Sequence, residues 1–110
     1  MDQVLEQIGK RLYLRRKQLG MTQEALAERA NITSQTISTA ELGKKAMRAD
    51  TIIRVCEALE ITPNYLLLGE VTGQDAAFLT EKISRLGPEQ YRHLADIIES
   101  YIAAVTSPEK

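Results

Sequence analysis

Apolar residues recur at steps of three and four along most of this chain, the spacing of one face of an α-helix. The first run extends from Gln3 to Leu19 and stops at Gly20. Two shorter runs follow, from Gln23 to Ala30 and from Thr33 or Ser34 to about Leu42. No segment here alternates between apolar and polar residues as a strand would. The pattern predicts helices throughout this part.

Two more helices are predicted between Thr51 and Gly69. A basic loop, Lys44 to Asp50, leads into a helix from Thr51 to Leu59. Thr62-Pro63 then predicts a new start, because Thr caps a helix and Pro fits its first position. That short fifth helix ends at Gly69. Residues 1–69 are therefore predicted to form a compact all-α domain of five helices.

The segment after Gly69 is predicted to be a separate helical part. Residues 70–74 (EVTGQ) are polar, contain Gly, and have the composition of a linker. Two helices are predicted in the C-terminal segment 75–110: one from Asp75 to Arg85, and one from Glu89 to about Val105 after a break at residues 86–88.

The last predicted helix has an apolar seam with successive spacings of three, four, three and four residues. The seam consists of Tyr91, Leu94, Ile98, Tyr101 and Val105. Ile97 and Ile102 widen this stripe. Three interpretations stay open: a homodimer seam, a helix that folds back on the first domain, or a helix that packs on its own domain along one flank and on a partner along the other.

Composition narrows the functional classes. The chain has 110 residues, 44% of them apolar, with one cysteine and one histidine. Cys56 lies on an apolar helical stripe and is interpreted as a small buried hydrophobe. His93 lies on the polar side of its helix with no nucleophile motif beside it. We therefore expect a cytoplasmic protein that is not an enzyme, with no metal, no cofactor and no membrane-spanning segment.

The charges are unevenly distributed. The formal net charge is −1, which is unusual for a protein that binds nucleic acid. From Gly9 to Arg54, however, ten Lys and Arg face four acids, which gives +6. From Glu70 to Lys110, four bases and seven acids give −3. Salt screens the attraction between a cation and a DNA phosphate beyond about 8–10 Å. A local basic face is therefore enough for binding to nucleic acid, even when the net charge is negative.

The segment from Gln23 to Leu42 (QEALAERANITSQTISTAEL) carries the most specific spacing in the chain. If Gln23 is its first position, small Ala27 is fifth, Asn31 ninth and Ile37 fifteenth. A small residue lets two helices cross closely, Asn tolerates the left-handed conformation of a tight turn, and Ile pins the second helix from beneath. This spacing is typical of a helix-turn-helix that contacts DNA.

From Ile8 to Gly69 the chain resembles the Cro/C1-type helix-turn-helix family, also called Xre, which includes the lambdoid phage repressors. The segments that carry the resemblance are IGKRL, RRKQLGMTQEALAERA, NITSQTIS, AELGKK and VCEALEITPNYLL. The resemblance implies a five-helix, lambda-repressor-like DNA-binding domain that pairs into symmetric dimers on near-palindromic operators. It also implies a structural ion pair between Arg16 and Glu41.

The chain departs from the family pattern at three places. Asn31 replaces the common turn Gly. Ala40 stands where the family usually has a larger apolar residue, so the third helix is expected to lie closer to the core. Residues 45–48 lack the frequent Pro-Ser/Thr before the fourth helix.

The third predicted helix supplies the candidate base contacts, because an α-helix fits the major groove of DNA. These candidates are Ser34, Gln35, Thr36 and Thr39. The amide of Gln35 can pair with adenine, and no Arg is present on this helix to bind guanine, so we expect A·T-containing half-sites. The candidate phosphate contacts are Gln23, Thr33, Ser38, Lys44, Lys45 and Arg48.

The predicted function is a sequence-specific transcriptional regulator, a repressor that binds double-stranded DNA as a homodimer. The alternative is a protein-interaction module, such as an autoregulating antitoxin or a regulator that docks a partner protein. The polar face of the third helix argues against this alternative, since protein-binding surfaces usually carry aromatic or aliphatic anchors. The C-terminal apolar stripe supports a regulatory protein partner for that segment only.

Overall fold

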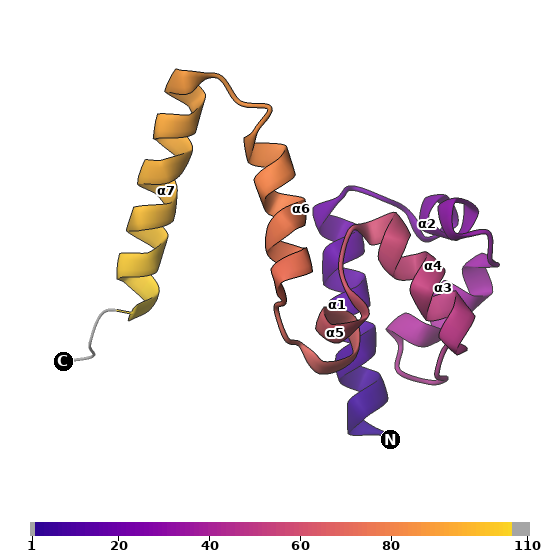
Figure 1. Ribbon diagram of the computed structural model, residues 1–110. Coiled ribbons are helices and arrows are strands. Elements are labelled where there is room, and N and C mark those ends of the chain that lie inside the picture. The colour runs from indigo at the N-terminus through magenta and orange to yellow at the C-terminus, as the bar shows by residue number, and fades with distance from the viewer. Residues whose placement is uncertain (1, 107–110) are drawn as a thin grey trace. The chain divides into compact units, whose positions relative to one another are not determined.

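The computed structural model describes residues 2–106 and contains seven α-helices and no strand in that range (Figure 1). Residue 1 and residues 107–110, the outer ends of the two predicted segments, lie outside the described residues. The all-α prediction is confirmed. The helices are α1 (Gln3–Gln18), α2 (Gln23–Ala30), α3 (Ser34–Glu41), α4 (Ala49–Leu59), α5 (Pro63–Leu68), α6 (Gly73–Ile83) and α7 (Pro88–Thr106).

Threonine side chains cap the N-termini of α2, α3 and α5. The hydroxyl of Thr22 accepts the N–H of Ala25 at 2.9 Å, and that of Thr62 accepts the N–H of Tyr65 at 3.1 Å. Thr33 caps α3 in the same way, so the helix itself begins at Ser34. Each cap satisfies a backbone donor that has no partner within the helix.

The starts of α4 and α6 differ from the sequence prediction. Both begin two residues early, at Ala49 and Gly73, and α6 therefore starts inside the predicted linker. The N-cap of α4 is Arg48, which makes no side-chain capping bond, so no capping residue marks that start. In α6 a usable signal was overlooked: Thr72 and Asp75 have the spacing of a capping box.

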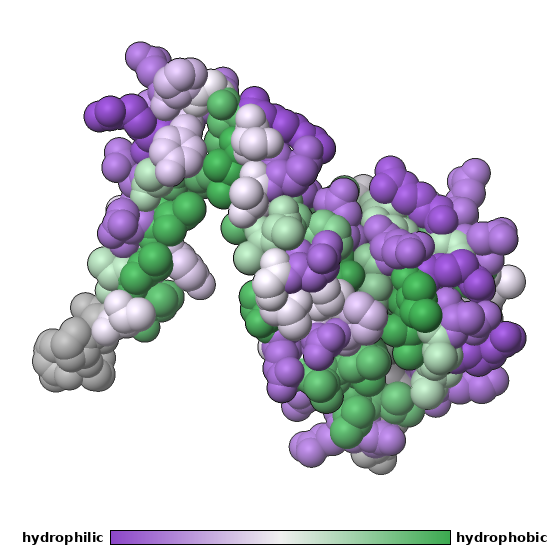
Figure 2. Space-filling model, viewed as in Figure 1, coloured by the Kyte–Doolittle hydropathy of each residue, from purple (hydrophilic) through white to green (hydrophobic). Residues whose placement is uncertain are grey.

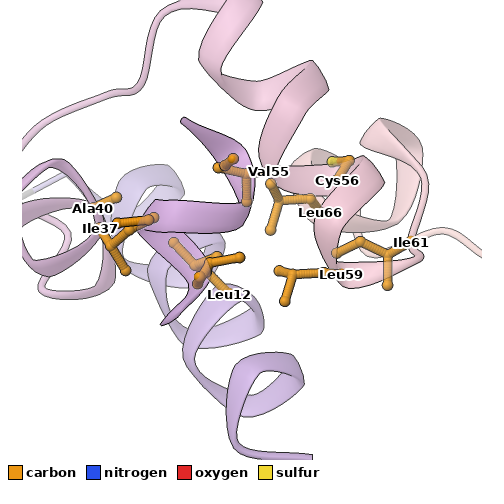
Figure 3. Close-up of a cluster of buried hydrophobic side chains, with 11 residues drawn as sticks. Leu12, Ile37, Ala40, Val55, Cys56, Leu59, Ile61 and Leu66 are labelled. Carbon is orange, nitrogen blue, oxygen red and sulfur yellow. The ribbon is translucent and has the colours of Figure 1, made fainter. Parts of the chain in front are cut away.

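Helices α1 to α5 enclose one hydrophobic core (Figure 3). Its fully buried large side chains are Leu12, Leu26, Ile37, Val55, Leu59 and Leu66. Burial of each such side chain contributes about 1.5–3 kcal/mol. Cys56 also lies in this core, and its burial raises the pKa of the thiol to about 11. The interpretation of Cys56 as a small buried hydrophobe is confirmed.

The C-terminal end of α3 lies directly against the backbone of α1. Gly9 of α1 is buried there, and a Cβ at this position would lie 2.4 Å from the carbonyl oxygen of Ala40. No side chain fits in that space, so Gly9 permits the contact. The missing side chain of Gly9 thus allows the backbone of Ala40 and Glu41 to approach α1 closely.

The chain divides into two compact units after Phe78, within α6, whereas the sequence predicted a linker at residues 70–74. The first turn of α6 belongs to the first unit, where the carboxylate of Asp75 accepts hydrogen bonds from Thr62. Neither α6 nor α7 contains a buried residue. Figure 2 shows hydrophobic residues along α7, where Ile97, Ile98, Tyr101, Ile102 and Val105 are exposed. In the described range, no helix is long and apolar enough to cross a membrane.

Candidate nucleic-acid interface

The turn between α2 and α3 has the geometry that its sequence predicts. Asn31 adopts the left-handed conformation, with φ 59° and ψ 49°, and caps the end of α2. The N–H of Ile32 then donates to the carbonyl oxygen of Ala27 at 2.9 Å. Ile37 is fully buried and Ala27 nearly so, and their burial in the core stabilises the packing of α2 against α3. The helix-turn-helix prediction is confirmed at each of its three key positions.

A buried ion pair fixes the end of α3 to α1. The guanidinium of Arg16 donates to both carboxylate oxygens of Glu41, from Nε at 2.6 Å and from Nη2 at 3.0 Å. The third guanidinium nitrogen donates to the carbonyl oxygen of Met21 at 2.7 Å. The two side chains are only 8% and 6% exposed. The hydrogen bonds with Glu41 raise the pKa of Arg16, although burial acts in the opposite direction. The ion pair that the family resemblance implied is therefore present.

Gln23, a predicted phosphate contact, takes part in this same network. Its amide nitrogen donates to Oε1 of Glu41 at 3.0 Å and so connects the start of α2 to the end of α3. A side-chain amide carries two N–H groups, so one remains for a phosphate oxygen. Gln23 is thus a structural residue as well as a candidate contact.

The candidate base contacts on α3 differ in their freedom. Gln35 is exposed, and its amide makes no hydrogen bond within residues 2–106. Thr39 is half-buried, and its hydroxyl donates to the carbonyl oxygen of Gln35 at 3.1 Å. The hydroxyls of Thr36 and Thr33 lie 3.0 Å apart and share a hydrogen bond. Ser34 is half-buried at the first helical position. Gln35 is therefore the side chain best able to bind a base edge.

A groove of about 570 Å³ lies between α3, the following loop and α4. Six of the predicted contact residues line it: Thr33, Gln35, Thr36, Thr39, Lys45 and Arg48. Ile32, Ala46 and Met47 add apolar lining, and Thr51 and Arg54 of α4 complete it. Ser34, Ser38, Gln23 and Lys44 are not part of this lining. The groove thus brings polar side chains of α3 together with two cations of the loop.

Four of the ten basic residues of the first unit are committed to the fold. Arg11 donates to the carbonyl oxygens of Leu66 and Leu67, at 2.8 and 3.1 Å, near the end of α5. Arg15 donates to Leu59 at the end of α4, and Arg54 to Ala30 at the end of α2. Arg16 is the fourth, in the pair with Glu41. The Nε of Arg15 lies 2.9 Å from the Leu59 carbonyl oxygen.

The six remaining cations are exposed: Lys10, Lys17, Arg29, Lys44, Lys45 and Arg48. Arg48 has an acidic neighbour that the sequence analysis overlooked. Its Nη2 lies 3.2 Å from a carboxylate oxygen of Asp50, and Nη1 of Arg54 lies 3.5 Å from the same oxygen. The Arg48 side chain is 83% exposed, and exposed pairs contribute at most about 1 kcal/mol. A phosphate can therefore replace Asp50 as its partner.

These features define a helix-turn-helix domain in which the second helix of the motif, α3, has an exposed polar face beside a basic loop. A family model described as helix-turn-helix matches residues 12–66, half of the chain. The chain belongs to the Cro/C1-type (Xre) helix-turn-helix family.

Two curated relatives and one solved structure illustrate this membership. Repressor protein C2 of Salmonella phage P22 is 28% identical over 71 residues, which are 64% of this chain and 33% of the relative. An HTH-type transcriptional regulator of Sinorhizobium fredii is 28% identical over 92 residues, 84% of this chain and 60% of the relative. This chain therefore spans about a third and about three fifths of these relatives.

The solved structure is that of the P22 c2 repressor in complex with a synthetic operator. It superposes with a TM-score of 0.56 at 30% identity and covers 57% of this chain and 96% of its own.

Removal of the Glu41 carboxylate is expected to destabilise the first unit strongly. In Glu41→Ala the Arg16 guanidinium stays buried without its counter-charge, which should lower the free energy of unfolding by about 3–5 kcal/mol. Urea denaturation followed by circular dichroism measures this loss. Glu81→Ala is the matched control, because it breaks the Glu81–Arg85 pair, whose side chains are 63% and 71% exposed. That control should cost less than about 1 kcal/mol. Equal losses in the two variants would contradict the structural role of the buried pair.

Proposed function

We propose that this protein is a sequence-specific repressor that binds near-palindromic operators as a homodimer, with α3 in the major groove of each half-site. One observation carries the proposal: the groove beside α3 unites the free amide of Gln35 with the exposed cations Lys45 and Arg48. Such a surface offers a hydrogen-bond donor and an acceptor to a base edge, and cations to the phosphates. This combination suits duplex DNA. The P22 c2 repressor, which is similar over this same region, was solved on a synthetic operator.

Gln35 is assigned the principal base contact. Its amide can donate to N7 and accept from N6 of adenine, which is the bidentate pairing typical of Gln. The hydroxyl proton of Thr39 is used within the helix, so this residue offers its methyl group, which suits the methyl group of thymine. Ser34 and Thr36 supply single hydroxyl contacts. Because α3 contains no Arg to bind guanine, we expect the half-site to contain A·T pairs.

Phosphate contacts are assigned to residues on either side of α3. Lys44 and Lys45 lie in the loop after α3 and are both exposed. Arg48 exchanges Asp50 for a phosphate when DNA binds. Gln23 keeps one N–H for the backbone, and the hydroxyls of Thr33 and Ser38 complete the set. These contacts supply affinity and orientation for every sequence alike.

The dimer is assigned to α7. This helix has 19 residues, none of them buried, and its seam residues Tyr91, Ile98, Tyr101 and Val105 are exposed. Knobs-into-holes packing against a second copy would bury that seam. A regulatory protein that covers the same stripe is the alternative occupant, and the mass of the purified protein in solution distinguishes the two.

Loss of the Gln35 amide should weaken operator binding and relax specificity. A bidentate base contact is worth roughly 1–3 kcal/mol, so Gln35→Ala should raise the dissociation constant for a selected operator about 5- to 150-fold. Fluorescence anisotropy on operators selected from random duplexes measures the change. Gln74→Ala, which removes an exposed amide from α6, is the control and should bind normally. An unchanged affinity in folded Gln35→Ala would refute the assignment.

Loss of two loop cations should weaken binding to all sequences equally. In Lys44→Ala/Lys45→Ala, each lost phosphate contact should reduce the slope of log K against log salt by about 0.9. Titrations at several salt concentrations on operator and random duplexes measure this slope. Lys82→Ala/Arg92→Ala removes the same charge from α6 and α7 and should leave the slope unchanged. An equal change in both double variants would mean that net charge matters and the loop position does not.

A charge placed in the α7 seam should separate the dimer. Ile98→Glu puts a carboxylate on the apolar face, so the mass measured by light scattering should fall from that of two chains to that of one. Ser100→Glu introduces the same group two residues later, on the opposite face, and should stay dimeric. A wild-type protein that has the mass of one chain at micromolar concentration would overturn the homodimer and favour a different partner.

A further inference from the structure

A small apolar pocket lies between the loop after α3 and four helices of the first unit. Its volume is about 100 Å³. Leu5 and Ile8 of α1, Ile52 of α4 and Leu67 of α5 supply the apolar walls, and all four side chains are only half-buried. None of these four residues belongs to the candidate DNA interface. The proposed contact with DNA therefore does not explain this pocket.

Two alanines leave the space open. Ala40 of α3 and Ala46 of the loop line the pocket with side chains that end at Cβ. A larger apolar residue at either position would fill part of it. Small apolar cavities hold no ordered water, so an apolar molecule that enters gains contacts without displacing hydrogen-bonded water. The pocket thus has the character of a site for an apolar group.

The loop forms a wall that the pocket shares with the groove of the candidate DNA interface. Lys45, Ala46 and Met47 line both. A molecule in the pocket therefore contacts three residues that also face the DNA in the proposed function. Two ligands that contact the same loop change each other's affinity when they favour different positions of it.

The one charged residue that lines the pocket indicates the polar end of its ligand. This residue is Lys45, which is exposed and has no ion-pair partner within residues 2–106. The flexible stem of a lysine lets its ammonium reach a carboxylate at the mouth of the pocket. An engineered apolar cavity of about 150 Å³ takes up benzene. The present pocket is smaller but is bordered by exposed Lys45 and Ala46, so a ring can enter while its carboxylate stays at the surface.

We propose that this pocket binds a small monocarboxylate with an apolar body, such as an aromatic acid, and that the bound acid lowers the affinity for operator DNA. The carboxylate pairs with the ammonium of Lys45, which the proposed function assigns to a phosphate. The ligand thus removes one phosphate contact from each half-site. The effect on DNA rests on the proposed function, whereas binding of the acid to the free protein does not. By linkage, operator DNA weakens binding of the acid by the same factor.

The first test is a titration of the purified full chain with benzoate, followed through the methyl NMR signals of Ile8, Met47 and Ile52. Binding should saturate at one benzoate per chain, with a dissociation constant in the millimolar range or below. Benzamide keeps the ring without the charge, and acetate keeps the charge without the ring. Each should bind at least fivefold more weakly than benzoate. Lys45→Gln should remove the preference for benzoate over benzamide.

Two variants that fill the pocket from different walls test its position. Ala40→Leu and Ala46→Leu should each weaken benzoate binding at least tenfold, while circular dichroism verifies that the helices are retained. Ala76→Leu is the matched control, because it puts the same side chain on the exposed surface of α6, and it should bind benzoate as wild type does. Wild-type benzoate affinity in both folded filling variants, or no saturable binding to wild type, would overturn the ligand site.

The second test measures operator affinity by fluorescence anisotropy at constant total salt, with acetate replacing benzoate in the reference. Loss of one phosphate contact per half-site should raise the dissociation constant of wild type at least fivefold at saturating benzoate. That of Ala40→Leu should not change. An unchanged operator affinity in wild type would overturn the effect on DNA. If wild type fails to distinguish selected from random duplexes, the proposed function is wrong, and the titration of the free protein still decides the ligand site.

Discussion

The bidentate contact between Arg16 and Glu41 is the constraint on which the candidate interface depends. It lies at the meeting point of α1, α3 and the start of α2, where Gln23 and the Met21 carbonyl also bind the pair. Moving two charges out of water costs several kcal/mol each, so such a pair is stable only when its hydrogen bonds are complete. Because the pair holds the last residue of α3, the helix cannot turn about its axis. Ile37 and Ala40 stay inside, and Gln35 stays outside.

The helix-turn-helix could be predicted from the sequence because local rules determine most of it. A threonine cap, a residue tolerant of positive φ and an apolar residue at a fixed distance each act within a few residues of the turn. The bounds of α2 and the cap at Thr62 followed from these rules. The start of α4 did not follow, because Arg48 supplies no capping side chain. The start of α6 was missed although the spacing of Thr72 and Asp75 is a local capping signal.

The roles of the charged residues could be predicted only in part. The sequence shows a basic stretch from Gly9 to Arg54 but does not show which cations are available to DNA. Arg11 binds a carbonyl group 55 residues away, and Arg15 one that is 44 residues away. Such contacts depend on how the helices pack, which periodicity does not specify. The ion pair of Arg16 could be anticipated only through the family resemblance, and the contact between Gly9 and the Ala40 backbone was not anticipated.

Magnitudes explain why one such domain is insufficient for a specific repressor. A bidentate amide–adenine contact contributes about 1–3 kcal/mol of discrimination, and single hydroxyl or methyl contacts contribute less. Specific binding, however, exceeds non-specific binding by about 4–10 kcal/mol. With no Arg on α3, one half-site reaches at most the lower end of that range, and two half-sites reach its middle. Under the proposed function, discrimination of this size needs both half-sites to be bound at once, which makes the proposed association through α7 essential. The unburied apolar surface of α7 has the chemistry that such an association needs.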